Sequence, residues 1–406
     1  MNILPILSTL RRHKITALLV ILEIALSCAI ICNAVFLIGQ RLERTRMPSG
    51  VAEHHLVMVQ AASIGEPADA KALAQEDLAA LRQIPGVSAA ALVNEVPFTN
   101  SSWNNGIKLD PNQKLSTLNA TVYYGENALE TLGTQLVAGR YFTSNEYVDF
   151  SAVEKNVKLY PHVVIITSDL ANRLWPGQNP LGKEMYNGNL EMRVVGVVKA
   201  LIRPSIFNGD NTAQWSFALP MRMSTDDASR YIIRVASPAQ RQQVMKAAVK
   251  ALRKVDPHRL VGQQQTLDEI RAKFFQNDRA MADMLIGVIV ALLLVTALGI
   301  VGLASFWVAQ RQRTIGVRRA LGATRLNILQ YFQTENFLLA TIGIVVGMLM
   351  AYGINLFLMT HYELPRLPWT YLPTGAVALW LIGQLAVLGP ALRASKVPPV
   401  VATRSV

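Results

Sequence analysis

Residues 284–325 read MLIGVIVALLLVTALGIVGLASFWVA followed by QRQRTIGVRRALGATR, an uncharged apolar stretch and then a basic segment. The apolar stretch, 284–309, exceeds the roughly 20 residues that a helix needs to cross a hydrocarbon core. The segment 310–325 contains no acid and the arginines Arg311, Arg313, Arg318, Arg319 and Arg325. Short basic loops beside spans stay on the cytoplasmic side, because Lys and Arg bias the orientation. The pattern predicts a membrane protein whose 310–325 segment is cytoplasmic.

The same basic segment is predicted to form a helix, a break and a second helix. Ile315 and Arg319 would share one helix face, Gly322 suits the position just after a helix, and Thr324 can cap the helix that follows. A short rigid helix between two spans is suited to receive a push from a cytoplasmic partner. The alternative is that its arginines only mark topology.

Composition supports a membrane protein with one substantial aqueous domain. Of 406 residues, 51% are hydrophobic and 16% are charged. The predicted spans are 15–38, 284–309, 337–359 and 372–392. The first is too long for an ordinary signal peptide and lacks a cleavage site after it, so it is predicted to be retained. The net charge of +12 is partly a topology signal, and no nucleic-acid partner is expected.

Both chain ends are predicted to be cytoplasmic, because basic residues precede the first span and follow the fourth. A cluster of Arg41, Arg44 and Arg46 after the first span runs against this orientation. It begins a very long segment, where the charge rule is weak.

The aqueous segment between the first two spans is predicted to contain two strand–helix–strand units. The first consists of 56–60, 69–83 and 87–96, and the second of 231–235, 238–255 and 260–265. Between them, 97–227 holds β-runs at 119–124, 163–166 and 192–198 and a helix at 168–175, which indicates an inserted mixed subdomain. From 266 to 283 the chain is charged and helical in pattern, with no Pro or Gly before Gly287. From composition, a continuous helix into the second span is one of two predictions, and the other is a solvated helix that ends at the bilayer.

Candidate chemical sites are few. The segment 177–184, GQNPLGKE, matches the first seven positions of a phosphate-binding loop, but Glu184 stands where Ser or Thr should bind magnesium. It follows a helix rather than a strand, so it is predicted to be a turn. The sequence shows no other Walker motif, no zinc-ligand spacing and no nucleophile motif. Cys28 and Cys32 lie one turn apart in one helix and are not expected to form a disulfide. Catalytic, cofactor and metal residues are not expected on this chain.

Glu23 lies about two turns into the first predicted span, where an ionisable group is costly. We expect a neutral carboxyl that bonds a neighbouring helix, such as the one carrying Thr296. The alternative is a proton or substrate path, but a relay needs further intramembrane acids, and only Glu335 is near.

The string RTIGVRRALGAT at 313–324 resembles the segment after the second span of FtsX-like permeases, the membrane subunits of MacB-type ABC transporters. LVAGRYF at 136–142, LWPGQNPLGK at 174–183 and VVGVV at 194–198 also look like that family. With the order of the spans, the resemblance covers nearly the whole chain.

The resemblance implies four transmembrane helices plus a large α+β periplasmic domain in a bacterial inner membrane. The implied periplasmic domain, 39–283, has a porter-like core at about 52–96 and 228–266, an inserted subdomain at about 97–227 and a stalk at 267–283. The other segments are the cytoplasmic N-terminus 1–14, the cytoplasmic coupling loop 310–336, the periplasmic loop 360–371 and the cytoplasmic tail 393–406.

The resemblance also implies partners. Two separate ABC ATPase subunits would carry ATP and magnesium, and a second permease, identical or paralogous, would stand beside this chain. The residues implied to contact the ATPase are Gly316, Arg318, Arg319, Ala320, Leu321, Gly322 and Ala323. Their motion would drive export of a periplasmic substrate through an adaptor and an outer-membrane channel. The alternative is an FtsX-type regulator of cell-wall hydrolases or a lipoprotein-extracting permease.

Overall fold

The computed structural model describes residues 14–65, 69–206, 211–362 and 366–398. The chain forms two compact units, one made of the residues up to Arg46 and from Asn277 onward, the other of Met47–Gln276. Most of the predicted N-terminal segment 1–14 and the end of the predicted tail 393–406 lie outside the described residues.

Four long helices make up the membrane unit: α2 (Lys14–Thr45), α9 (Gln276–Gln310), α11 (Arg325–Tyr362) and α12 (Leu372–Ser395). The shortest has 24 residues, and all four are long and apolar enough to cross a membrane. Each predicted span lies inside one of these helices. The spans therefore have the lengths and the apolar character that the sequence predicts.

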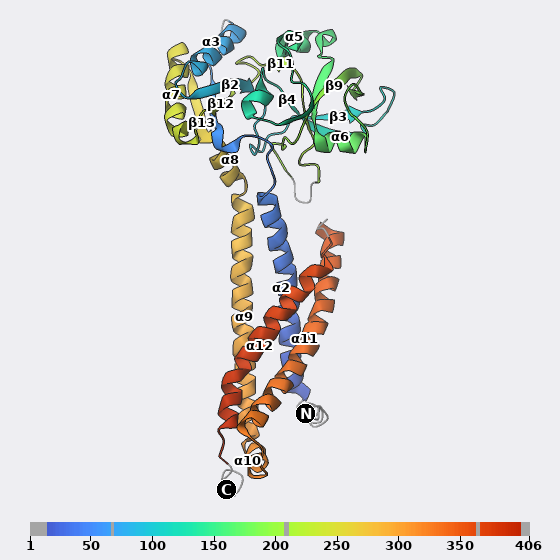
Figure 1. The fold of residues 1–406 in the computed structure, drawn as a ribbon, viewed down its shortest axis with the longest axis vertical. Helices are drawn as coiled ribbons and strands as arrows, with labels where there is room; N and C mark the ends of the chain where they lie inside the picture. The colour runs from blue at the N-terminus through green and yellow to red at the C-terminus, as the bar shows by residue number, and fades with distance from the viewer. Residues whose placement is uncertain (1–13, 66–68, 207–210, 363–365, 399–406) are drawn as a thin grey trace. The chain divides into compact units, whose positions relative to one another are not determined.

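Helices α2, α11 and α12 pack closely against one another (Figure 1). Glycines make the approach of α2 and α11 possible. A Cβ on Gly347 would lie 2.5 Å from Cβ of Cys28, and one on Gly343 would lie 2.9 Å from Cβ of Ile24. Because lipid tails are as apolar as the side chains, membrane helices rely on such close packing of small residues. Cys28 and Cys32 are buried and free, as predicted.

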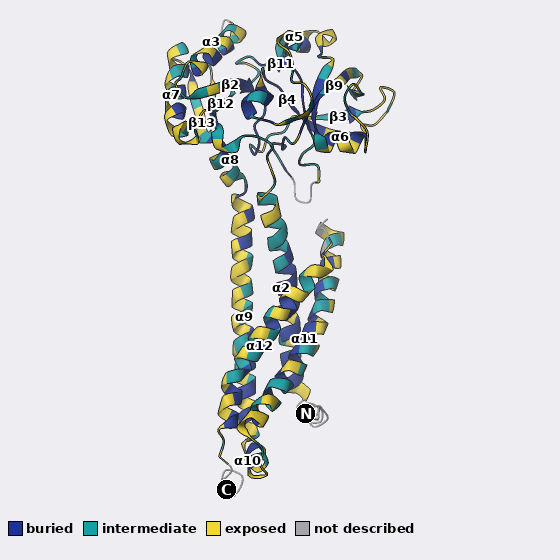
Figure 2. Ribbon diagram, viewed as in Figure 1, coloured by how far each residue is buried: buried dark blue, intermediate teal, exposed yellow. Residues whose placement is uncertain are grey.

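Helix α9 is less covered by its neighbours than the other three. Met284, Val288 and Val290 are exposed in its first half, and Leu294 and Leu298 in its second. Figure 2 shows exposed residues along much of this helix. Its buried side chains, which include Thr296, concentrate in the second half. The part of α9 near α10 is therefore the part that the bundle holds most firmly.

Salt bridges at the Asp278 end of α9 explain two of the arginines that disagreed with the orientation rule. Arg41 and Arg44 of α2 lie 2.6 Å and 3.2 Å from Oδ1 of Asp278, whose side chain is 8% exposed. These arginines neutralise a buried acid and hold α2 to α9. They have a structural role apart from topology.

The second unit contains a four-stranded antiparallel sheet in the order β13-β1-β12-β2. Its strands are β1 (Leu56–Ala62), β2 (Val87–Val93), β12 (Arg230–Val235) and β13 (Leu260–Thr266), joined by α3 (Ala70–Arg82) and α7 (Arg241–Val255). Both predicted strand–helix–strand units are thus present and share one sheet. Val244, Ala248 and Leu252 recur every four residues on α7 and are buried in the core, which is why this face of the helix packs inward.

A larger sheet lies between the two halves of this unit in the sequence, in the order β5-β9-β7-β10-β4-β3-β8. Its strands are β3 (Asn104–Lys108), β4 (Leu118–Tyr123), β5 (Leu136–Gly139), β7 (Val163–Thr167), β8 (Glu184–Asn187), β9 (Leu190–Val198) and β10 (Ser216–Ala218). The predicted β-runs are β4, β7 and β9, and the predicted helix is α6 (Ser168–Leu174). The mixed parallel and antiparallel pairing confirms the predicted mixed character of the insertion.

The segment that resembles a phosphate-binding loop is a turn, as predicted. Gly177 and Gly182 have positive φ values of 69° and 78°, and the chain continues into strand β8. A phosphate-binding loop would instead open a helix whose amide groups point at the phosphates. Nζ of Lys183 lies 5.7 Å from the ring centre of Trp175, which ends α6 just before the loop.

The prediction of one continuous helix from 266 into the second span is wrong. Helix α8 (Leu267–Phe274) starts at a capping box of Thr266 and Glu269 and ends before Phe275, and α9 starts at Gln276. Phe275 is fully buried and packs edge-on against Phe98, with ring centres 5.6 Å apart. This aromatic packing fixes a non-helical residue where composition alone allowed a helix to continue.

Candidate functional site

Helix α10 (Gln312–Ala320) connects α9 to α11 and carries most of the predicted coupling residues. It ends at Leu321 and Gly322, whose φ of 95° is the left-handed conformation typical of a residue after a helix. The Thr324 hydroxyl then accepts a hydrogen bond of 3.2 Å from the amide of Asn327, in the first turn of α11. The predicted helix, break and second helix are therefore confirmed.

The start of α10 is held by a buried ion pair. Nη1 of Arg311 donates to both carboxylate oxygens of Glu335 on α11, at 3.0 Å and 2.9 Å. The two side chains are 12% and 1% exposed, and the Arg311 guanidinium also lies 5.5 Å from the ring centre of Trp307. A buried carboxylate is costly unless a charge compensates it, and Arg311 supplies that charge.

The sequence analysis did not identify this pair. Glu335 was considered only as an intramembrane acid, and Arg311 only as one of several loop arginines. The available signal was that an acid in an apolar helix needs a positive partner, and the basic segment is the nearest source. The structure shows which arginine it is.

The end of α10 is tied to the end of α12. Nη1 of Arg319 donates to the carbonyl oxygens of Ser395 and Val397, at 2.7 Å and 3.4 Å. The neighbouring Arg318 stacks on Tyr331, with its guanidinium 4.7 Å from the ring centre. Arg311, Arg318 and Arg319 therefore all make contacts inside their own chain.

The remaining predicted coupling residues divide between an inner and an outer face. Gly316 is buried, as is the neighbouring Ile315, and Ala323 is partly buried. Ala320, Leu321 and Gly322 are exposed, and Leu321 keeps 83% of its surface accessible. We call the exposed residues Arg313, Val317, Ala320, Leu321, Gly322, Arg325 and Leu326 the outer face of α10.

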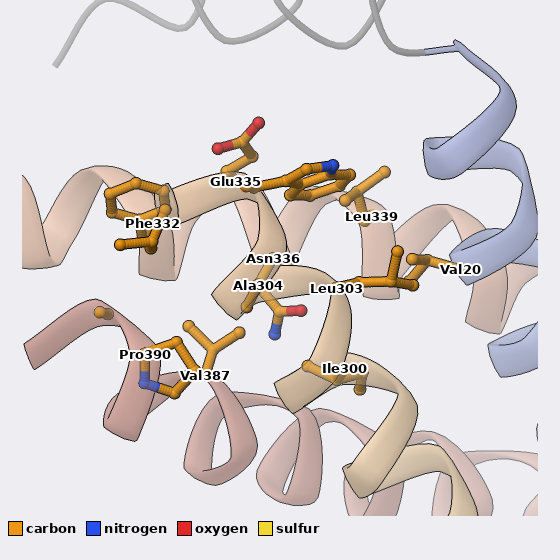
Figure 3. Close-up of a pocket in the computed structure, with 13 residues that line it drawn as sticks. Val20, Ile300, Leu303, Ala304, Phe332, Glu335, Asn336, Leu339, Val387 and Pro390 are labelled. Atoms are coloured by element: carbon orange, nitrogen blue, oxygen red, sulfur yellow. The ribbon is translucent and has the colours of Figure 1, made fainter. Parts of the chain in front are cut away.

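A small pocket lies beside the Arg311–Glu335 pair, where all four long helices contribute side chains (Figure 3). Its lining includes Val20, Ala304, Trp307, Glu335, Asn336 and Pro390. The space open to the centre of a water molecule is about 20 Å³, enough for a single water. Among the described residues, neither the Trp307 indole nitrogen nor the Asn336 amide nitrogen has a hydrogen-bond partner. The pocket marks a place where the helices are incompletely packed.

Glu23 packs against α9, the helix that the sequence analysis named. A Cβ on Gly299 would collide with the Glu23 carboxylate, so the glycine makes room for it. On the same helix, Thr296 shares a hydrogen bond of 2.8 Å with Ser27 of α2. Among the residues that the structure describes, no three His, Cys, Asp or Glu side chains are placed to hold a metal ion.

Two family models match the chain. One, described as the MacB-like periplasmic core domain, matches residues 17–251, more than half of the chain. The other, described as the FtsX-like permease C-terminal region, matches residues 286–399 and so includes α10.

Individual relatives agree with these matches. The chain is 26% identical over 296 residues to the macrolide export ATP-binding/permease protein MacB of Chromobacterium violaceum, across 70% of this chain and 43% of that protein. It therefore spans less than half the length of that relative. It is 24% identical over 418 residues to the uncharacterized ABC transporter permease YvrN of Bacillus subtilis, across 97% of this chain and 96% of that one.

A solved structure of the periplasmic region of MacB from Actinobacillus actinomycetemcomitans aligns with a TM-score of 0.34 and 14% identity, over 55% of this chain and 94% of that one. The family models cover both the domain between the first two long helices and the helices that follow it. The chain therefore belongs to the MacB-like, FtsX-type family of ABC transporter permeases.

Proposed function

We propose that this chain is the permease subunit of a MacB-like transporter and passes the ATP-driven motion of a separate ABC ATPase to its periplasmic domain. The observation that carries the proposal is the outer face of α10. Leu321 is 83% exposed there, beside Val317 at 44% and Leu326 at 58%. A single exposed leucine is ordinary, but a group of apolar side chains on a short loop indicates a contact surface.

The charged residues of this face indicate which residues the partner surface should carry. Arg313 and Arg325 of the outer face are exposed as well. Interfaces commonly combine an apolar centre with polar edges, and arginine pairs well with carboxylates. The matching ATPase surface would be an apolar hollow that receives Leu321 and has acidic residues at its rim. In this arrangement α10 and both chain ends are cytoplasmic.

Motion of α10 would reach the periplasmic domain through α9 and α2. Helices α9 and α2 are joined at two levels, by the Ser27–Thr296 hydrogen bond and by the contacts of Arg41 and Arg44 with Asp278. Both helices continue covalently into the chain of the periplasmic domain. The bundle would act as a force transmitter, with a second permease, identical or paralogous, beside it and no substrate passing through it.

The work of the complex is proposed to be export of a periplasmic substrate through an adaptor and an outer-membrane channel. The large inserted subdomain supports this choice, since a simple activator of a hydrolase needs less periplasmic mass. Cross-linking of the tagged full chain in native membranes separates the two functions. Capture of an adaptor or channel supports export, whereas capture of a cell-wall hydrolase supports the regulatory alternative.

The docking proposal is tested with Leu321→Asp. The control is Leu115→Asp in the periplasmic domain, where Leu115 has the same 83% exposure. The tagged full chain is purified from membranes, and the co-purifying ABC ATPase is identified by mass and its ATP turnover measured. We expect Leu321→Asp to lose the ATPase, because it places an unpaired carboxylate in the apolar contact, and Leu115→Asp to retain it. Equal recovery with both variants would refute the docking role of α10.

A further inference from the structure

Arg319 of α10 makes contacts that play no part in the proposed docking. It was expected to face the ATPase, yet its guanidinium donates to Ser395 O at 2.7 Å and Val397 O at 3.4 Å. Ser395 is the last residue of α12 and is 4% exposed. Ser395 O therefore belongs to the buried end of another span, and Val397 O lies two residues beyond that end.

The chemistry of a helix end explains this contact. The last carbonyl groups of a helix have no partner inside the helix, and they carry the negative end of its dipole. A guanidinium satisfies both needs, since it offers several donors and a permanent positive charge. The neighbouring turn of α12 is buried, with Ala391 at 1% and Ala394 at 0% exposure. Arg319 thus joins α10 to a buried part of α12.

The two ends of α10 are therefore fixed to two different spans. Arg311 binds Glu335 of α11 at the start, and Arg319 binds the end of α12. The covalent chain adds α9, which ends at Gln310. A displacement of α10 cannot be taken up by a flexible loop, because each of its ends is bonded to a helix.

We propose that Arg319 is a positioning residue that makes α12 move with α10, so that the fourth span takes part in the ATP-driven motion together with α2 and α9. This inference rests on the proposed coupling to an ATPase. The incomplete packing beside Pro390 of α12, in the pocket of Figure 3, gives α12 room to shift against α9 and α11. Loss of the Arg319 contact should leave docking intact and disconnect α12.

The experiment measures the movement of α12 directly. Spin labels are attached to cysteines introduced at Leu349 of α11 and Leu392 of α12, which are 71% and 46% exposed. The native Cys28 and Cys32 are fully buried and should stay unlabelled. The distance distribution between the labels is recorded for the full chain with its ATPase, with and without ATP, and ATPase recovery is measured on the same samples.

In the otherwise native chain, ATP should shift the distance between the labels. Arg319→Gln should retain the ATPase and lose the shift. Arg319→Lys should restore part of it, because an ammonium group can still bond Ser395 O. Arg253→Gln, which removes an exposed arginine of α7 outside the proposed docking surface, should behave like the native chain.

Three results would overturn the inference. One is an unchanged ATP-driven shift in Arg319→Gln. Another is loss of the ATPase in Arg319→Gln but not in Arg253→Gln, which would make Arg319 a docking residue and leave the proposed function standing. The third is no recovery of an ATPase with the native chain, which would remove the proposed function itself. If Arg319→Gln does not fold, Arg319→Lys decides the matter: an unreduced shift in that variant contradicts the positioning role, and a reduced one supports it.

Discussion

The ion pair between Arg311 and Glu335 should be a main determinant of the stability of the α10 end of the bundle. Glu335→Gln removes the negative charge and leaves the Arg311 guanidinium, 12% exposed, without a counter-charge. Breaking a buried pair in this way costs roughly 3–5 kcal/mol. Since Arg311 retains some access to solvent and its contact with Trp307, we expect a loss of about 2–3 kcal/mol.

The pair is best measured with a double-mutant cycle of Glu335→Gln, Arg311→Gln and both changes together. Removing both charges leaves no uncompensated ion, so the double variant should be more stable than the sum of the single losses predicts. We expect a coupling free energy of about 2 kcal/mol, a roughly 30-fold effect on the unfolding equilibrium. Loss of helix content in a denaturing-detergent titration of the purified full chain gives the free energies. Additive single losses would refute the claim that the two residues interact directly.

Two further predictions concern the periplasmic domain and the helix packing. Burial raises the pKa of Glu95, and the nearby Arg230 offsets only part of this rise. The folded state therefore binds a proton more readily than the unfolded state, and its stability falls as pH rises through the raised pKa. Glu95→Gln should flatten this dependence in thermal unfolding from mildly acidic to neutral pH, and an unaltered slope would contradict the assignment. Gly347→Ala should destabilise the membrane unit by about 1–3 kcal/mol, because its Cβ would lie 2.5 Å from Cβ of Cys28. The control is Gly353→Ala, where an added Cβ meets no neighbouring atom within 4 Å. Equal effects of the two changes in the same detergent titration would count against the packing argument.

The spans and the strand–helix–strand units could be predicted from local patterns. A run such as 284–309 must lie in a membrane or a large core whatever surrounds it, because its side chains are apolar throughout. The turn at 177–184 was also predictable, since Glu184 replaces the hydroxyl that a phosphate-binding loop requires. In each case the physical cause lies within the segment itself.

Contacts between distant segments could not be predicted in the same way. The break at Phe275 follows from the burial of its ring against Phe98, and the hydrogen bond between Ser27 and Thr296 joins α2 to α9. Both features depend on which side chains the folded chain brings into contact, and that is set by three-dimensional packing.

Local patterns are enough to predict four membrane-spanning helices, a large α+β domain after the first and a basic helix between the second and third. Hydrophobic length, residue alternation and capping residues act locally, so they can be recognised along the chain. What the arginines of that helix do depends instead on tertiary packing. Arg311 and Arg319 have the same chemistry in the sequence, but one meets a carboxylate of α11 and the other the terminal carbonyls of α12. A guanidinium bonds whichever acceptor the packed helices bring within reach, and that acceptor is fixed by how the spans pack.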